Sequence, residues 1–423
     1  MLGRRDFLRW NAAAAGALLL PATACRAVAA FSGDTRSPED IARDESLWVQ
    51  VQQSFSVDRS ALNLNNGGVS PAPRLVQDAV KRHLDFSHQL PVHNMNRVLW
   101  PQAEAVRERM AAAWGVDSGE IALMRNASEA LQTVQLGLDL QPGDEVLTST
   151  HDYPRMITAF QQRERRDGIV LKQIEMPVPM TDQAALVELY RAAITPATKL
   201  LLVCHITPFT GQVLPVKEIV AMAREHGVPT LIDGAHSFAH LDFNLAELDC
   251  DYFATSLHKW LHAPHGTGLL YVRREKIREL WPLMAAREEQ ENDIRKFEEI
   301  GTASPAPYLG IAEALSFHEG IGGANKEARL RHLRDLWAEP LLDDPRVSLY
   351  TSRDEQLSCG IATLRVEGMD MLGLYNTLWR RHRIVTSPIN RDDVLGLRIS
   401  PSISNTPQEL ERFVRVVREH LPA

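Results

Sequence analysis

The chain has 423 residues, of which 44% are hydrophobic, and it carries a formal net charge of −8. This length allows two domains with a large core, and the ordinary apolar fraction argues against a disordered chain or a multispanning membrane protein. The sequence contains no run of basic residues interleaved with aromatic ones, which argues against nucleic acid as a partner.

The N-terminal residues have the pattern of a targeting segment. The pair Arg4-Arg5 matches a twin-arginine motif, residues 12–20 are apolar, and residues 27–29 are small, as at a cleavage site. The apolar run is shorter than the roughly 20 residues that a membrane span requires. We therefore predict a twin-arginine signal peptide at residues 1–29, the machinery of that export route as a partner, and a periplasmic protein.

The four cysteines are few and widely spaced. Cys204, Cys250 and Cys359 each lie beside apolar, strand-like sequence, which is typical of buried thiols rather than of a disulfide framework or a metal site. Cys25 ends a tetrad that weakly resembles a lipoprotein cleavage box. A lipid anchor at Cys25 is therefore the alternative to a free periplasmic protein, and no metal is expected.

The rest of the chain is expected to form an arm and two domains. Residues 30–72 are polar with scattered helix formers and end in a turn-rich loop, which predicts an N-terminal arm. Residues 73–320 begin with two helices, at 73–88 and 101–114, and then alternate strands with helices. This alternation predicts a large α/β domain with a mainly parallel seven-stranded sheet covered on both faces. The expected strands cover residues 121–124, 145–148, 169–174, 199–205, 230–233, 252–254 and the stretch that ends at residue 272.

The C-terminal quarter of the chain changes its pattern. A glycine-rich stretch at residues 320–323 suggests a boundary, so residues 321–423 are predicted to form a smaller α+β domain. Its expected elements are helices at 326–337 and 406–420 and strands at 360–366 and 395–399.

The chemistry of the protein is predicted from two neighbouring strand ends. Asp233 ends one buried strand, and Lys259 follows the next strand and precedes a glycine-rich turn at 265–268. A lone lysine is most often a solvated charge, and Asp233 alone is as well explained as a helix cap. A carboxylate and a lysine in this order suit pyridoxal phosphate, which the lysine would hold as a Schiff base while the carboxylate keeps the pyridine nitrogen protonated.

A second group of residues suits the phosphate of such a cofactor. Ala127 and Ser128 open a predicted helix at residues 130–138. A small hydroxyl residue at this position normally caps the helix, but the same free N–H groups also bind phosphate. With Lys259 and Asp233 in the chain, we favour the phosphate site.

These motifs resemble the class V branch of the aminotransferase superfamily, the pyridoxal-phosphate enzymes of fold type I. The resemblance runs from Asn65 to the C-terminus and is strongest at residues 233–236 and 258–259. Within the class, residues 205–213 and 258–261 resemble the isopenicillin N epimerase-like group more than the cysteine desulfurases.

The resemblance implies roles for individual residues. Lys259 would be the cofactor-linked lysine and catalytic base, and Asp233 the partner of the pyridine nitrogen. Arg398 would bind the substrate carboxylate, and the loop that carries Thr302 would reach the phosphate of a neighbouring subunit, which implies a homodimer. The cofactor-binding residues implied in this way are Ala127, Ser128, Tyr153, Asp233, His236, Ser256, His258, Lys259 and Thr302.

The reaction itself stays open at this level, because the lysine and aspartate serve many pyridoxal-phosphate reactions. Desulfuration needs a nucleophilic cysteine on a loop before Arg398, and residues 384–397 contain none. The sequence therefore predicts an enzyme that acts at the amino-bearing carbon of an amino-acid or peptide-like substrate, with epimerase- or aminotransferase-type chemistry. The alternatives are a lyase or cysteine desulfurase-like enzyme, and a non-catalytic binding protein that retains the fold.

Overall fold

The computed structural model describes residues 28–422, and its largest element is a seven-stranded sheet. The five strands from β3 to β7 are parallel, whereas β8 runs antiparallel to both of its neighbours. This confirms the predicted fold class. In spatial order the strands are β2 (Ile121–Met124), β8 (Gly268–Val272), β7 (Tyr252–Ser256), β6 (Thr230–Asp233), β5 (Thr198–Cys204), β3 (Glu145–Ser149) and β4 (Val170–Ile174).

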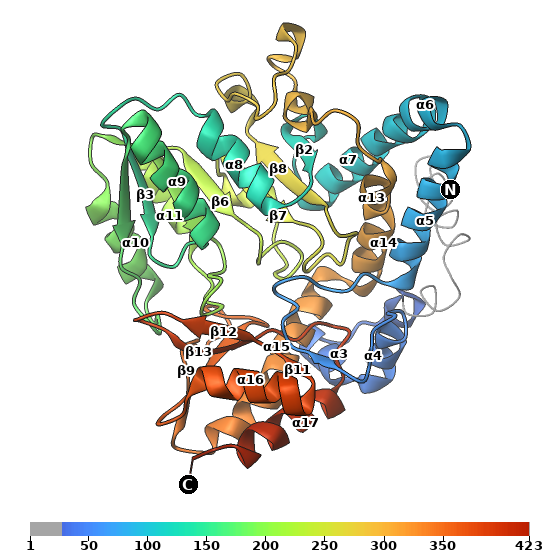
Figure 1. Cartoon of the computed structure of the whole chain (residues 1–423), viewed down its shortest axis with the longest axis vertical. Coiled ribbons are helices and arrows are strands. Elements are labelled where there is room, and N and C mark those ends of the chain that lie inside the picture. The colour runs from blue at the N-terminus through green and yellow to red at the C-terminus, as the bar shows by residue number, and fades with distance from the viewer. Residues whose placement is uncertain (1–27, 423) are drawn as a thin grey trace.

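Helices cover both faces of this sheet (Figure 1). Successive side chains of a strand point to opposite faces, so the neighbours Leu231 and Ile232 of β6 belong to two different cores. The core that contains Leu231 is covered by α8 (Ala127–Gly137) and α9 (Pro154–Asp167). The opposite core is covered by α5 (Arg74–Gln89), α7 (Trp100–Trp114), α10 (Gln183–Ala193), α11 (Val216–Glu225) and α14 (Ile311–Ile321).

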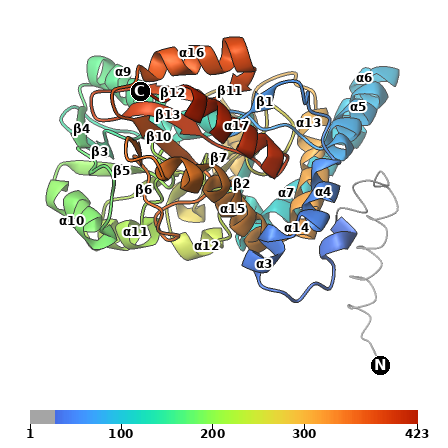
Figure 2. The same ribbon diagram turned by 90° about the horizontal axis from the view of Figure 1, so that it is seen from below.

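A second, four-stranded antiparallel sheet is formed by the C-terminal part of the chain. Its strands in spatial order are β12 (Ser387–Asn390), β13 (Leu395–Ile399), β10 (Ala362–Val366) and β9 (Val347–Leu349). A third core, which includes Trp337 and Phe413, packs this sheet against α15 (Gly323–Leu342), α16 (Met371–His382) and α17 (Pro407–Glu419). Figure 2 shows these helices from below, with α3 (Pro38–Arg43) beside α15. The predicted boundary at residues 320–323 falls between α14 and α15, and the division into domains stays a prediction.

The N-terminal arm is more ordered than its polar sequence suggested. Ser37 and Asp44 cap α3 and α4 (Glu45–Gln52) by accepting hydrogen bonds from backbone N–H groups in the first turn. The Trp48 side chain is fully buried, its indole Nε1 donates to the Ile41 carbonyl at 2.8 Å, and the Arg329 guanidinium lies 5.1 Å from its ring. Burial of this one large side chain attaches both short helices to the core that α5, α7 and α14 also cover.

A short segment after α4 forms a separate two-stranded sheet with β11 and links the C-terminal part of the chain to the large sheet. β1 (Leu62–Asn63) pairs in parallel with β11 (Ile384–Val385), and Asn66 N donates to the Ser400 carbonyl at 3.0 Å. A few residues later, Ser70 N donates to the His258 carbonyl at 3.2 Å. Residues 62–70 therefore extend from the small sheet to the turn that carries Lys259.

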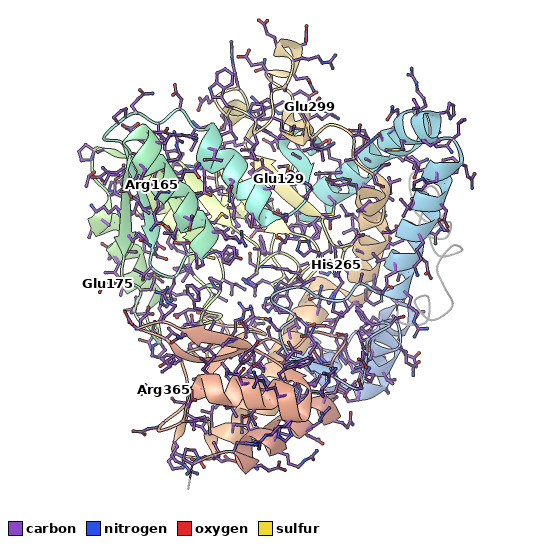
Figure 3. All side chains as sticks on the ribbon, in the orientation of Figure 1. Glu129, Arg165, Glu175, His265, Glu299 and Arg365 are labelled. Atoms are coloured by element: carbon purple, nitrogen blue, oxygen red, sulfur yellow. The ribbon has the colours of Figure 1, made fainter. Side chains whose placement is uncertain are left out.

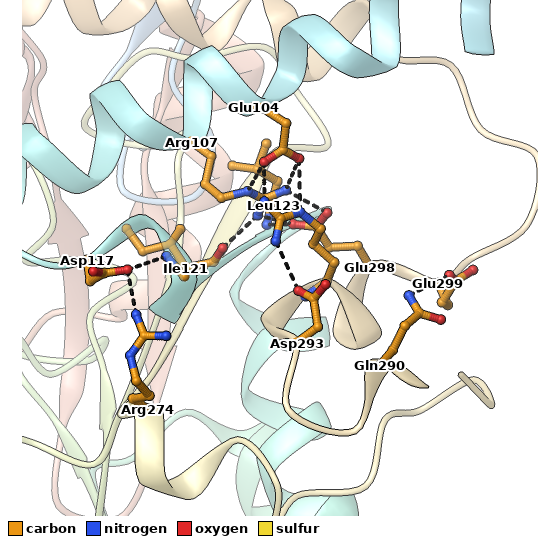
Figure 4. A network of polar contacts seen from close by, with 12 residues as sticks. Glu104, Arg107, Asp117, Ile121, Leu123, Arg274, Gln290, Asp293, Glu298 and Glu299 are labelled. Carbon is orange, nitrogen blue, oxygen red and sulfur yellow. Dashed lines mark hydrogen bonds and ion pairs between the residues drawn. The ribbon is translucent and has the colours of Figure 1, made fainter. Parts of the chain in front are cut away.

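Residues 273–305 form an irregular excursion on the upper side of the large sheet (Figure 1). Its end is attached by Arg107, a buried side chain that donates to the Ile121 carbonyl at 2.6 Å and pairs with Glu298 at 2.9 Å (Figure 4). This pair fixes the start of the loop that carries Thr302. The remaining short segments of the fold are α6 (Pro91–His93), η1 (Asn94–Leu99), η2 (Ser118–Glu120), α12 (Leu245–Leu248), η3 (Arg274–Lys276), η4 (Glu288–Gln290), η5 (Ile294–Glu298) and α13 (Ala306–Leu309).

The predicted signal peptide lies almost wholly outside the described residues, which begin at residue 28. The signal peptide and the lipid anchor at Cys25 therefore stay predictions. Of the helices in residues 28–422, none combines the length and the apolarity needed to cross a bilayer.

Candidate active site

A cavity of about 600 Å³ lies where the parallel strands of the large sheet end. Cys204, Asp233 and Ser256 are the last residues of β5, β6 and β7, and Tyr153 follows β3. The chain order of the sheet reverses between β3 and β5, and such a reversal opens a crevice at the carboxyl ends of the strands. Arg398 of β13 lines the cavity from the small sheet.

The structure brings nine of the ten predicted site residues into this cavity. Thr302 is the exception, since it is exposed in the loop after η5 and does not line the cavity. Its predicted contact concerns a neighbouring subunit and stays a prediction, as does the homodimer. The nine residues that line the cavity are Ala127, Ser128, Tyr153, Asp233, His236, Ser256, His258, Lys259 and Arg398.

Lys259 lies on a tight turn directly after β7. Leu257 N donates to the Thr267 carbonyl at 3.0 Å, which closes this turn against the start of β8, and the Lys259 Nζ lies 3.5 Å from His236 Nε2. Burial lowers the pKa of Lys259 to about 8, and the nearby Asp233 carboxylate opposes this shift. A minor but substantial fraction of the amine is therefore neutral near physiological pH, as a nucleophile or a base requires.

Asp233 is a buried carboxylate that needs a cationic partner. Ala235 N donates to its Oδ1 at 2.9 Å. Burial raises the pKa of Asp233, and the charge of Lys259 acts in the opposite direction. Because an ionised carboxylate is costly in a buried place without a cation, this position suits the protonated nitrogen of a bound ring.

Two of the side chains that line the cavity carry a buried polar atom without a partner among the described residues. His236 Nδ1 is one, and burial holds the pKa of this imidazole well below its usual range, so the ring is neutral. Arg398 Nε is the other. Such atoms are rare in native proteins unless a ligand or water completes them, and both residues line the cavity.

Arg398 is positioned by neutral groups rather than by an ion pair. Its Nη1 donates to the Pro208 carbonyl at 2.7 Å and its Nη2 to Asn65 Oδ1 at 2.8 Å. Burial lowers the pKa of Arg398 only to about 10, so the side chain is charged at neutral pH. Because no carboxylate of residues 28–422 pairs with it, the structural ion pair that would explain this arginine without a ligand does not occur in the described chain.

The opening turn of α8 forms another corner of the cavity. Asn126 caps the helix by accepting from Glu129 N at 2.9 Å, and Ser256 Oγ accepts from Ala127 N at 2.9 Å. A Cβ atom on Gly268 would lie 2.7 Å from the Asn126 Cα, so the glycine lets β8 approach this turn. The corner joins hydroxyl groups to the positive end of a helix, which suits a phosphate group.

Four other residues that line the cavity were not indicated by any sequence pattern. Phe209, Pro388 and Ile389 add apolar surface beside Arg398, and Cys204 adds a thiol. Burial, together with the carboxylates of Asp152 and Asp233, raises the pKa of Cys204 well above its ordinary value. This thiol is therefore neutral and a poor nucleophile.

Comparison with known proteins defines the class to which this fold and site belong. The sequence profile of the family described as "Aminotransferase class-V" matches residues 62–413. The chain belongs to this family, and its cofactor is pyridoxal 5'-phosphate.

Particular relatives include two epimerases and a desulfurase. The chain is 32% identical over 393 residues to the isopenicillin N epimerase of Amycolatopsis lactamdurans, a match that covers 88% of this chain and 98% of the relative. It is 31% identical to the isopenicillin N epimerase of Streptomyces clavuligerus, with 86% and 96% covered. A probable cysteine desulfurase of Vibrio cholerae is 27% identical, with 84% and 92% covered.

Solved structures share the fold at lower identity. The cystine C–S lyase C-DES, in complex with its product cysteine persulfide, matches with a TM-score of 0.77 and 23% identity over 86% of this chain and 99% of that chain. The cysteine desulfurase CsdA of Escherichia coli matches with a TM-score of 0.76 and 21% identity over 88% and 98%.

The cavity fits the cofactor of the family. The Asp233 carboxylate has no ion pair in the described chain, His236 Nδ1 is unpartnered, and the start of α8 offers hydroxyl and N–H groups at its positive end. These three features correspond to a ring nitrogen, a ring oxygen and a phosphate. Lys259 supplies the amine that would hold the aldehyde.

Proposed function

We propose that this protein is an epimerase-type enzyme that exchanges a proton at the amino-bearing carbon of an amino-acid or peptide-like substrate. One observation carries the proposal: the amine of Lys259 and the unpaired guanidinium of Arg398 line the same cavity. The similarity to two isopenicillin N epimerases over nearly their whole length supports this reaction type.

Each side chain has a distinct task in this proposal. Arg398 binds the substrate carboxylate through a planar pair of hydrogen bonds, which fixes the position of the neighbouring carbon. Lys259 Nζ takes up the proton of that carbon and returns one. Asp233 keeps a proton on the ring nitrogen. When bound, pyridoxal phosphate supplies the electron sink that stabilises negative charge at the carbon.

Cysteine desulfurase-like chemistry is the alternative suggested by the relative from Vibrio cholerae. That reaction needs a reactive thiolate. The three cysteines of residues 28–422 are all buried, and burial raises the pKa of each: Cys204, Cys250 and Cys359. The chemistry of the described thiols therefore favours proton exchange.

The proposal is tested by incubating the holoenzyme in D₂O with panels of L- and D-amino acids and peptides. An epimerase incorporates deuterium at the amino-bearing carbon and forms the opposite configuration, measured by mass and by chiral chromatography. A keto acid as product would show a transaminase, and released sulfur a desulfurase. A cofactor spectrum that responds to no amine would leave only a binding protein.

Arg398→Lys is expected to lower kcat/KM sharply for a carboxylated substrate. Lysine keeps the charge but loses the planar fork. The loss of one charge-assisted hydrogen bond costs about 1.5–3 kcal/mol, which corresponds to about 10- to 150-fold in kcat/KM. The absorption of the bound cofactor should not change, because Lys259 and Asp233 are untouched. A purely structural arginine would instead lower stability and leave kcat/KM of the folded fraction intact.

We also propose that the protein reaches the periplasm by the twin-arginine route, on the basis of the N-terminal sequence. Replacing Arg4 and Arg5 with lysines should leave folded, cofactor-loaded protein in the cytoplasm. Cell fractionation with measurement of bound cofactor tests this. Efficient export of the double variant would point to another route.

A further inference from the structure

Phe209 lies at the tip of a hairpin-shaped loop between β5 and α11. Ile206 and Val213 pair across the base of this loop, and Thr207 N donates to the Gln212 carbonyl at 2.9 Å. The loop therefore has the internal hydrogen bonding of a rigid element. At its tip, Phe209 lines the cavity.

The same loop is attached to the small sheet beside Arg398. Arg398 Nη1 donates to the Pro208 carbonyl, and Thr363 Oγ1 of β10 donates to the Phe209 carbonyl at 2.5 Å. The Arg398 guanidinium, which would bind a substrate carboxylate, is thus hydrogen-bonded to Pro208, the residue before Phe209. A substrate bound by Arg398 has the Phe209 ring as its neighbour.

Two side chains, Arg391 and His151, contact the ring itself, and Asp393 bonds both of them. The guanidinium carbon of Arg391 lies 4.4 Å from the centroid of the Phe209 ring, within the range of a cation–π contact. Arg391 Nε donates to Asp393 Oδ1 at 2.9 Å, and the other oxygen of Asp393 lies 2.7 Å from His151 Nε2. The His151 ring meets Phe209 edge-on at 5.8 Å. We call His151, Arg391 and Asp393 the ring clasp.

The ring clasp joins segments from both parts of the chain. His151 belongs to the loop between β3 and α9, whereas Arg391 and Asp393 belong to the turn between β12 and β13. The strand β12 before this turn also places Pro388 and Ile389 in the cavity. The position of the apolar surface beside Arg398 thus depends on one connected set of contacts.

We infer that Phe209 determines substrate specificity, because its ring forms with Pro388 and Ile389 an apolar wall for the side chain of the substrate, and that the ring clasp positions this wall. The substrate class is an amino acid, free or at the reacting end of a larger molecule, whose side chain begins with apolar methylene groups. This inference rests on the proposed function, since it takes Arg398 as the carboxylate site.

The wall is tested by binding a graded series of amino acids to the holoenzyme. Glycine, L-alanine, L-norvaline and L-norleucine differ by one carbon each, and their Kd values follow from the change in cofactor absorption. Each methylene that packs on the wall should lower Kd by about fourfold. Identical Kd values for glycine and norleucine would overturn the inference.

Two variants of Phe209 separate apolar contact from general damage. Phe209→Ala removes the wall, so the gain in affinity for each added methylene should fall below about twofold, whatever its effect on the Kd of glycine. Phe209→Leu keeps much of the apolar surface and should retain most of the gain. An equal loss of affinity for all four amino acids in Phe209→Ala would contradict a role in specificity.

The ring clasp is tested with a matched pair of arginine variants. Arg391→Met removes the charge above Phe209 and should flatten the Kd series without changing the Kd of glycine. Arg365→Met is the control, because Arg365 lies 5.9 Å from the Tyr350 ring on the outside of β10 and does not line the cavity (Figure 3). If the Kd values of the four amino acids in Arg391→Met fell with each methylene as they do in the wild type, the ring clasp would not position the wall.

Failure of the wall and failure of the proposed function give different results. A holoenzyme that exchanges the α-proton of these amino acids, yet binds all four equally, would refute the wall and leave the proposed function intact. A holoenzyme whose cofactor spectrum responds to none of these amino acids and to none of the peptides, and that exchanges no proton with any of them, would refute both.

Discussion

Lys259→Ala is expected to abolish the borohydride-trappable link between protein and cofactor and the absorption near about 410–430 nm that protonated pyridoxal imines show. Among the described residues, Lys259 is the one lysine that lines the cavity. The loss of a general base alone costs about 10²- to 10⁴-fold in rate, so proton exchange should fall at least that far. Absorption spectra and mass spectrometry after borohydride reduction measure both effects.

Lys326→Met provides the matched control. Lys326 is also a buried lysine, and burial lowers its pKa to about 7, yet it donates to the Trp260 carbonyl and does not line the cavity. This variant should lose stability and keep the link in its folded fraction. If Lys259→Ala kept a trappable cofactor and Lys326→Met lost it, the assignment of Lys259 would be wrong.

Asp233→Asn is expected to fold and bind the cofactor but to lose most of its activity. The amide can still accept the hydrogen bond from Ala235 N, whereas it cannot balance a positive charge. Removing one partner of a buried ion pair costs about 3–5 kcal/mol, which corresponds to about two to four orders of magnitude in kcat. Single-turnover kinetics together with the cofactor content of the purified variant measure this loss.

Asp251→Asn is the control at a partly buried aspartate beside the same sheet. Asp251 accepts from Thr230 N at 2.8 Å at the other end of β6 from Asp233, and it does not line the cavity. We expect this variant to lose stability while its turnover per folded molecule stays normal. Near-normal turnover of a well-folded Asp233→Asn protein would reject the role of Asp233.

Local sequence patterns predicted the helices and strands whose apolar residues recur with a regular period. The helix predicted at residues 101–114 coincides with α7 to within one residue, and the apolar strands that end at Asp233 and precede Lys259 lie where expected. The helix predicted at 326–337 is longer in the structure and continues past Pro340, because burial of Leu341 outweighs the local preference of proline. Periodicity shows which face of a helix is apolar, but it does not show how far tertiary contacts extend the helix.

The parts of the site that were missed depend on contacts between distant residues. Asn65 holds Arg398 across 333 positions, and Arg391 reaches Phe209 across 182. Nothing in the sequence around either residue indicates such a partner. The family resemblance located Arg398, but the apolar wall and the ring clasp became visible only when the segments were placed in space.

The parallel pairing of β1 with β11 has a consequence for how the molecule is made. Leu62 must find Ile384, and the cavity needs Arg398, so the site is complete only after almost the whole chain has left the ribosome. Contacts of such large sequence separation form late, because the chain entropy of closing the loop is lost before they contribute. The large sheet can therefore mature first, and cofactor capture becomes the last step of folding. Because the cofactor binds only the folded protein, its binding stabilises the pairing of β1 with β11 against unfolding.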